Sequence, residues 1–122
     1  MTANYVSNIE INGVSYPIRE GGEVTSLAAS GSITLADNSI NKITATGAVT
    51  FTLPTVTDTT VFHQILVQLN MASAQTIDVG TTYYFSATAP DLSAAGTYNL
   101  IYEYDNTASH WVVGALVKGA AA

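Results

Sequence analysis

The sequence contains no cysteine in its 122 residues. This absence excludes disulfide bonds, thiolate catalysis and the zinc sites that depend on sulfur ligands. It leaves the compartment open, because a chain without cysteine folds equally well in oxidising and in reducing surroundings. A chain of this length buries about two-thirds of its unfolded surface, so a stable core requires neither a disulfide nor a metal. We therefore expect one domain with at most one appendage, and no cofactor.

Charged residues are also scarce, at 10% of the sequence, against about 25% in typical domains. The net charge is −6, and the only basic side chains are Arg19, Lys42 and Lys118. A phosphate-binding surface requires clustered cations, so nucleic acid is not an expected partner. An anionic membrane surface is disfavoured for the same reason, and no apolar run approaches the roughly 20 residues of a membrane span.

Threonine, serine and asparagine take the place of the missing charges. Threonine suits a pleated, half-buried surface, and a neutral hydroxyl costs less to desolvate than Lys or Glu. Such a surface favours packing against copies of the same chain or against a large neutral partner. The alternative is an ordinary β-rich domain that has no such partner.

From residue 24 onward, short alternating segments are separated by turn residues. These segments are GSITLA, AVTFTLP, VFHQILVQLNM, TIDVG, TTYYFSA and a final hairpin of TYNLIYEYD and HWVVGALV. About eight or nine strands in roughly 95 residues predict an all-β fold, an antiparallel β-sandwich of the jelly-roll or immunoglobulin-like type over 24–119. No internal repeat is visible, and residues 120–122 are expected to fray.

A separate hairpin is predicted at the front, in IEINGVSYPI. Asn12-Gly13 is a strong turn signal, since both residues tolerate the positive φ of a type I′ turn. The register that follows pairs Ile11 with Val14, Glu10 with Ser15, Ile9 with Tyr16 and Asn8 with Pro17. One face of the hairpin then carries only apolar side chains, those of Ile9, Ile11, Val14 and Tyr16.

An isolated two-stranded hairpin is marginally stable in water, so this one requires a support. The support is the chain's own β-domain, a neighbouring copy, or a separate protein. Gly21-Gly22 forms a joint and not a tight turn, which favours the last two. We therefore expect residues 1–23 to form an arm with a hinge. Its interface with a capsid or another subunit is predicted to consist of Ile9, Ile11, Val14, Tyr16 and Ile18.

Groups that could perform catalysis are few, and the protein is not expected to be an enzyme. His63 and His110 lie on different predicted strands, with no carboxylate at a recurring spacing from either. Each is interpreted as a residue at a strand end or rim. Four aspartates fall in apparent turns, where aspartate bonds its own backbone: Asp37, Asp58, Asp91 and Asp105. No metal site is predicted.

The aromatic residues suggest a binding role. Tyr83, Tyr84 and Phe85 follow one another, so at least one tyrosine points outward from a strand. Tyrosine and tryptophan are enriched in protein interfaces, and they also stack on sugars. The candidate contacts to a receptor or a host-surface glycan are Tyr84, Tyr104 and Trp111. For each one the alternative is packing in the core with its polar atom at the edge.

Several stretches taken together resemble a known family. FTLPTVTDTTVFHQILVQL, TIDVGTTYYF and PDLSAAGTYNLIYEYDNTASHWVVG resemble the β-domains of tailed-bacteriophage virion proteins, particularly head-fibre proteins that decorate capsids. IEINGVSYPIRE is similar to N-terminal segments of phage structural proteins.

The resemblance implies a non-enzymatic virion component on the capsid surface, usually a homotrimer, fixed to the major capsid protein by its N-terminal region. The collagen-like or coiled-coil shaft of such fibres is missing, so a short decoration knob is expected. The alternative is a carbohydrate- or receptor-binding module of a phage tail fibre, and a third reading is a structural domain of a larger fibre.

Overall fold

The computed structural model describes residues 8–17 and 23–119. The strands are β1 (Asn8–Ile11), β2 (Val14–Pro17), β3 (Glu23–Ser26), β4 (Gly31–Thr34), β5 (Ser39–Thr44), β6 (Val49–Thr52), β7 (Gln64–Met71), β8 (Ile77–Asp78), β9 (Gly96–Asp105) and β10 (His110–Gly119). The described part of the chain contains no helix, so the predicted all-β fold is confirmed. The tail at 120–122, for which fraying is expected, lies outside the described residues.

From β3 to β8 the chain alternates between two sheets. β3, β5 and β7 lie side by side and parallel in one sheet, and β4, β6 and β8 do so in the other. Each step from one sheet to the other and back is one turn of a coil, which is the arrangement of a short parallel β-helix. The turns differ in length, since Val24 pairs with Ile40, 16 positions later, whereas Ile40 pairs with Leu66, 26 positions later.

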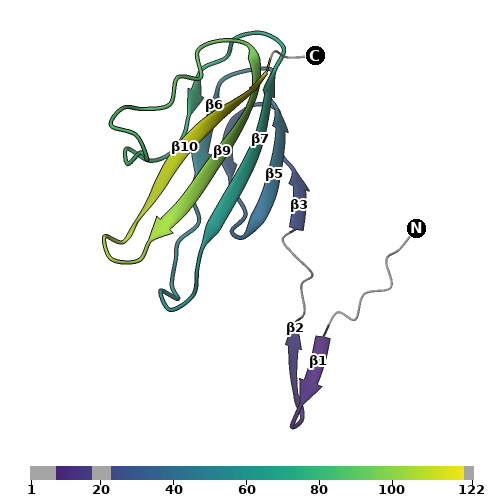
Figure 1. The fold of residues 1–122 in the computed structure, drawn as a ribbon. Coiled ribbons are helices and arrows are strands. Elements are labelled where there is room, and N and C mark those ends of the chain that lie inside the picture. The colour runs from purple at the N-terminus through teal and green to yellow at the C-terminus, as the bar shows by residue number, and fades with distance from the viewer. Residues whose placement is uncertain (1–7, 18–22, 120–122) are drawn as a thin grey trace, which may run out of the picture.

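The predicted final hairpin is formed by β9 and β10, joined by a four-residue loop at 106–109. β9 also pairs antiparallel with β7, which completes a five-stranded sheet in the order β10-β9-β7-β5-β3 (Figure 1). The sheets are therefore mixed, and the purely antiparallel arrangement predicted from the sequence is not the one found. The connections 35–38 and 45–48 have the length of hairpin loops, but each crosses to the other sheet.

Both sheets contribute to one hydrophobic core. The alternation seen in the sequence predicts its members, because the inward side chains of each strand are two residues apart. The most deeply buried are Leu35, Val49, Phe51, Ile65, Val67, Leu69, Met71, Leu100, Tyr102 and Val113.

A buried asparagine holds the corner between β4 and β5. The Asn41 Oδ1 atom accepts a hydrogen bond from the Ala36 N–H at 2.9 Å. Its Nδ2 atom donates to the Ala36 carbonyl at 3.2 Å and to the Ser39 carbonyl at 3.3 Å. Asn38, within the same corner, adopts a positive φ of 51°. Asn41 thus satisfies the N–H and carbonyl groups of Ala36, which lies in the corner outside both sheets.

The two edges of the five-stranded sheet differ. At the β10 edge, the Val113 N–H donates to the Tyr83 carbonyl and the Phe85 N–H donates to the Val113 carbonyl, each at 3.0 Å. The segment 83–85 therefore covers this edge, as natural sheets often require. At the other edge, β3 pairs with β5 and with no further described strand.

Candidate functional site

The front hairpin has the register predicted from the sequence, with Ile9 paired with Tyr16 and Ile11 with Val14. Asn12 and Gly13 both have positive φ, of 51° and 76°, as a type I′ turn requires. β1 and β2 pair with each other and with no other described strand, and Figure 1 shows them as a ribbon of their own.

The predicted contact surface of this hairpin is not tested by the fold. For β1 and β2 the structure describes the backbone, and the side chains proposed as anchors lie outside what it describes. Ile18 and the Gly21-Gly22 joint lie outside the described residues altogether. The interface set therefore remains a prediction.

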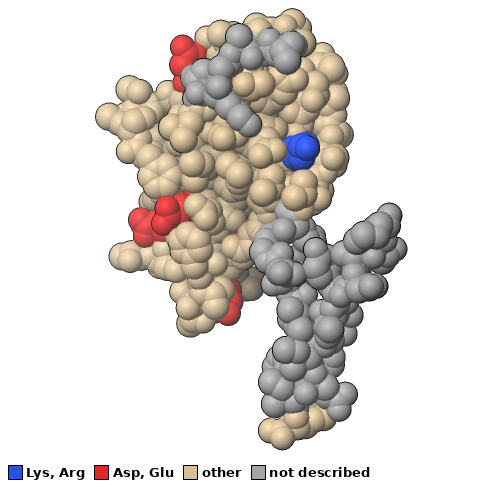
Figure 2. All heavy atoms as spheres, turned by 45° about the vertical axis from the view of Figure 1, so that its right-hand side comes forward, with Lys and Arg blue, Asp and Glu red and all other residues tan. Residues whose placement is uncertain are grey.

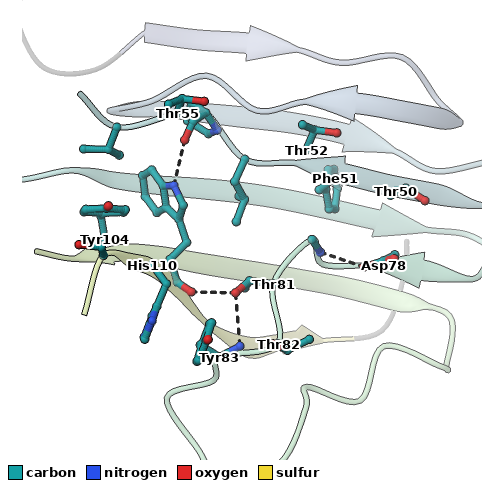
Figure 3. Close-up of a pocket in the computed structure, with 16 residues that line it drawn as sticks. Thr50, Phe51, Thr52, Thr55, Asp78, Thr81, Thr82, Tyr83, Tyr104 and His110 are labelled. Atoms are coloured by element: carbon teal, nitrogen blue, oxygen red, sulfur yellow. Dashed lines mark hydrogen bonds between the residues drawn. The ribbon is translucent and has the colours of Figure 1, made fainter. Parts of the chain in front are cut away.

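A groove of about 860 Å³ opens on the body where β8 ends (Figure 3). β8 pairs with the first half of β6 only, at Val49 and Thr50, so the second half of β6 has no described strand beside it on the side away from β4. The segment 80–83 and the start of β10 form the other side of the groove. Its described lining includes five threonines and one carboxylate, from Asp78, but no lysine or arginine.

Two aromatic rings are stacked at one end of this groove. The rings of Tyr83 and His110 are parallel within 2°, with their centroids 3.5 Å apart. Figure 3 shows the two side chains next to each other. Tyr83 is 49% exposed, so the ring surface that His110 does not cover faces solvent.

Hydrogen bonds fix the segment that carries Tyr83. The Thr81 hydroxyl donates to the Trp111 carbonyl at 2.8 Å, and the Tyr83 N–H donates to the Thr81 hydroxyl at 3.3 Å. Gly80 begins the segment with a φ of 85°, and a Cβ at this position would lie 2.2 Å from the Phe51 carbonyl oxygen. Only glycine allows so close an approach to β6 in this conformation.

Of the three predicted glycan contacts, two line the groove and one does not. Trp111 and Tyr104 line the groove and meet edge to face, with ring centroids 5.4 Å apart. Trp111 is only 6% exposed, and its indole N–H donates to the Pro54 carbonyl at 3.0 Å, so it forms a wall and not an open platform. Tyr84 packs against the core and does not line the groove.

Tyr83 and His110 are not among the contacts predicted from the sequence. One signal was present, because a run of aromatic residues sends neighbours to opposite faces, and Tyr83 and Phe85 are the exposed members of that run. His110 gave no signal of this kind. Its ring meets Tyr83 because β10 returns beside a segment 27 positions earlier in the chain.

His63 lies directly before β7, at a strand end as predicted, and joins two loops. Its Nδ1 atom is 2.5 Å from the Asp37 carboxylate and its Nε2 atom is 2.6 Å from the Asp58 carbonyl. Both partners are acceptors, so both ring nitrogens donate when the two bonds are made, and the ring is then charged. The bond to the Asp58 carbonyl, assisted by Asp37, raises the pKa of His63 above its usual value.

The turn aspartates largely behave as predicted. Asp58, Asp91 and Asp105 each accept a hydrogen bond from the backbone N–H two residues later. These and neighbouring hydrogen bonds lower the pKa of all three carboxyl groups. Asp37 differs, because its carboxylate faces His63 and not its own backbone.

Within residues 8–17 and 23–119, no three metal-binding side chains lie together as a metal site requires. No helix long and apolar enough to cross a membrane occurs in the described ranges. No model of a known protein family matches the sequence, and no curated protein matches it significantly.

Proposed function

We propose that the protein is a non-enzymatic virion protein of a tailed bacteriophage, a head-fibre or capsid-decoration protein at the capsid surface. The observation that carries the proposal is the front hairpin, which is formed in the predicted register but pairs with no other described strand. A two-stranded hairpin of this kind is marginal unless it packs on something. By the resemblance of the sequence to head-fibre proteins, the partner on which the hairpin packs is proposed to be the major capsid protein.

In this proposal the hairpin attaches the protein by two means. Its apolar face is buried against the capsid or a neighbouring subunit, and its open strand edges add to a sheet of the partner. The residues proposed to be buried are Ile9, Ile11, Val14, Tyr16 and Ile18. The body, in which two sheets enclose one core as in a sandwich, then projects from the shell as a short knob.

A deletion tests the attachment. Removing residues 1–22 keeps β3, which begins at Glu23, and is expected to leave the body folded but unable to bind capsids that lack the protein. Binding is measured by co-sedimentation with purified capsids. A truncated protein that still decorates capsids contradicts the proposal.

Substitutions in the full chain separate the two faces of the hairpin. Ile9→Asn with Tyr16→Asn changes one cross-strand pair on the apolar face, and binding is expected to be lost. Glu10→Asn with Ser15→Asn changes the next pair, which the alternation places on the opposite face. This control is expected to bind as the unaltered chain does.

The body is also proposed to form a homo-oligomer, a trimer by the family resemblance, through the outer face of the five-stranded sheet. An uncharged row crosses all five strands in register: Val24, Ile40, Leu66, Ile101 and Gly114. Val24 is 63% exposed, and Phe62, 59% exposed, lines a hollow of about 550 Å³ together with Leu66 and Ile101. Exposed apolar side chains that lie together in this way often mark an interaction site.

Charge favours a second copy as the occupant of this face. Chains of net charge −6 repel one another unless they meet through a neutral surface. Away from the turns, the described charged residues on this face are Lys42 on β5 and Glu103 on β9. These two strands lie on either side of β7, which carries Leu66. Figure 2 shows a lysine isolated in a mostly uncharged surface. Around a three-fold axis, Lys42 of each copy can lie opposite Glu103 of the next, so that neighbouring copies meet through complementary charges.

A further inference from the structure

We propose that the groove beside β6 binds a neutral carbohydrate, with one sugar ring stacked on Tyr83. This goes beyond the proposed structural role, since the groove lies on the body and involves no residue of the arm. It assigns a ligand class to the space between β6, the segment 80–83 and the start of β10.

The platform for the sugar is the stacked pair of Tyr83 and His110. A pyranose ring presents a flat patch of C–H groups, and the electron-rich face of an aromatic ring is their complement. His110 covers one face of Tyr83 at 3.5 Å and leaves the other face accessible. The Tyr83 N–H donates to the Thr81 hydroxyl, and the Tyr83 carbonyl accepts from the Val113 N–H. Because these two bonds fix the backbone of Tyr83, the platform is in place before the ligand arrives.

The rest of the groove supplies hydrogen-bonding groups for sugar hydroxyls. Thr50, Thr52 and Thr82 are exposed along its lining, and their hydroxyls have no hydrogen-bond partner among the residues that the structure describes. A hydroxyl both donates and accepts, as do the hydroxyls of a sugar. Asp78 adds a carboxylate, of which Oδ1 already accepts the Gly80 N–H at 2.9 Å.

The charge of the groove selects a neutral ligand. Its described lining has a carboxylate and no lysine or arginine, and the whole chain has a net charge of −6. A sialylated, sulphated or uronic-acid sugar would meet repulsion without a compensating cation. The pocket is therefore complementary to hexoses and N-acetylhexosamines that carry no charge.

The test uses the full chain on an array of neutral and acidic oligosaccharides, followed by titration with the neutral ones that bind. The single tryptophan, Trp111, lines the groove, so its fluorescence is expected to change on binding. We expect at least one neutral oligosaccharide to bind. Binding of acidic glycans alone, or of no glycan, overturns the proposal.

Variants locate the binding to the groove. Tyr83→Ala is expected to weaken it about tenfold, the loss of one good ring contact. Phe85→Ala, an equally exposed aromatic residue on the same segment but outside the groove, is the control and should bind within about twofold. Equal binding by the Tyr83→Ala protein and the unaltered chain contradicts the proposal.

A second pair of variants keeps the test valid if loss of Tyr83 disturbs the fold. Thr52→Val removes a hydroxyl from the lining with little change in shape, and weaker binding is expected. Thr57→Val makes the same change at an exposed position outside the lining and is expected to have no effect. If both variants bind sugar like the unaltered chain, the hydrogen-bonding role of the groove is wrong. None of these variants alters the arm, so capsid attachment is measured independently of them.

Discussion

The Nδ1 atom of His63 lies 2.5 Å from the Oδ2 atom of Asp37, although the two residues are 26 positions apart. This contact joins the corner before β5 to the long connection before β7, and the second ring nitrogen of His63 binds the Asp58 carbonyl in that same connection. The Tyr104 N–H donates to the His63 carbonyl at 3.1 Å, which ties β9 to the same point. His63 therefore holds together three segments at one end of the body, two of them through its ring and β9 through its main-chain carbonyl.

This arrangement makes stability depend on pH. The hydrogen bonds of His63 raise its pKa in the folded state above the ordinary value of about 6.5. A raised pKa contributes stability that is fully present below about pH 6.5 and is lost as the pH rises through the folded-state pKa. We expect the midpoint of thermal unfolding to fall over that window.

The control for the pH dependence is His63→Gln, which retains a donor but does not titrate. Its unfolding midpoint is expected to lack the fall above about pH 6.5 that is assigned to His63. If the variant and the unaltered chain lose stability in parallel over that window, the assignment to His63 is wrong.

Gly80 gives a second prediction, concerning the wall of the groove. Gly80→Ala would place a Cβ 2.2 Å from the Phe51 carbonyl oxygen, at a φ of 85°. The positive φ alone costs about 1–2 kcal/mol for an alanine, and displacement of β6 adds to this. We expect the free energy of unfolding in urea to fall by more than about 2 kcal/mol.

A substitution at Gly31 separates the cost of the positive φ from the cost of the contact with Phe51. It has a φ of 90°, but a Cβ there would meet nothing within 4 Å. Gly31→Ala should therefore cost only the conformational part, about 1–2 kcal/mol. Equal losses in the two variants would show that the contact with Phe51 has no energetic consequence.

Local features of the fold were predictable because their causes are local. Asn12-Gly13 determines the turn of the front hairpin, and the turn determines the register. The alternation around Ile65 and Leu69 predicts which side of β7 is buried, and the short loop after Asp105 predicts the final hairpin. None of these inferences requires knowledge of a distant partner.

The parallel pairings were not predictable, because they depend on contacts between segments that are far apart in the sequence. A strand pattern shows which face is buried but not the direction of the neighbouring strand, so Ile40 gives no sign that it pairs with Val24 and Leu66. The coil also leaves no repeat in the sequence, because the connection 53–63 lengthens one turn and not the other. The stack of Tyr83 on His110 likewise exists only once β10 has packed beside segment 83–85.

The third prediction concerns self-association through the outer face of the five-stranded sheet. Leu66 is at the centre of the row that crosses this face, with Lys42 and Glu103 on opposite sides of it. Leu66→Glu places a charge where two copies are proposed to meet, and an unpaired charge buried in an interface is strongly unfavourable. We expect light scattering to show an oligomer for the unaltered chain and a monomer for this variant.

The matched control is Ser32→Glu, which adds the same charge at an exposed position of β4, on the other sheet. It is expected to remain oligomeric, because a surface charge away from the interface changes association little. Salt provides a further distinction. If Lys42 and Glu103 pair between copies, high salt should weaken the association, whereas contact through Leu66 and Ile101 alone should not weaken with salt. An unaltered chain that stays monomeric at high concentration rules out the outer face as a site of self-association.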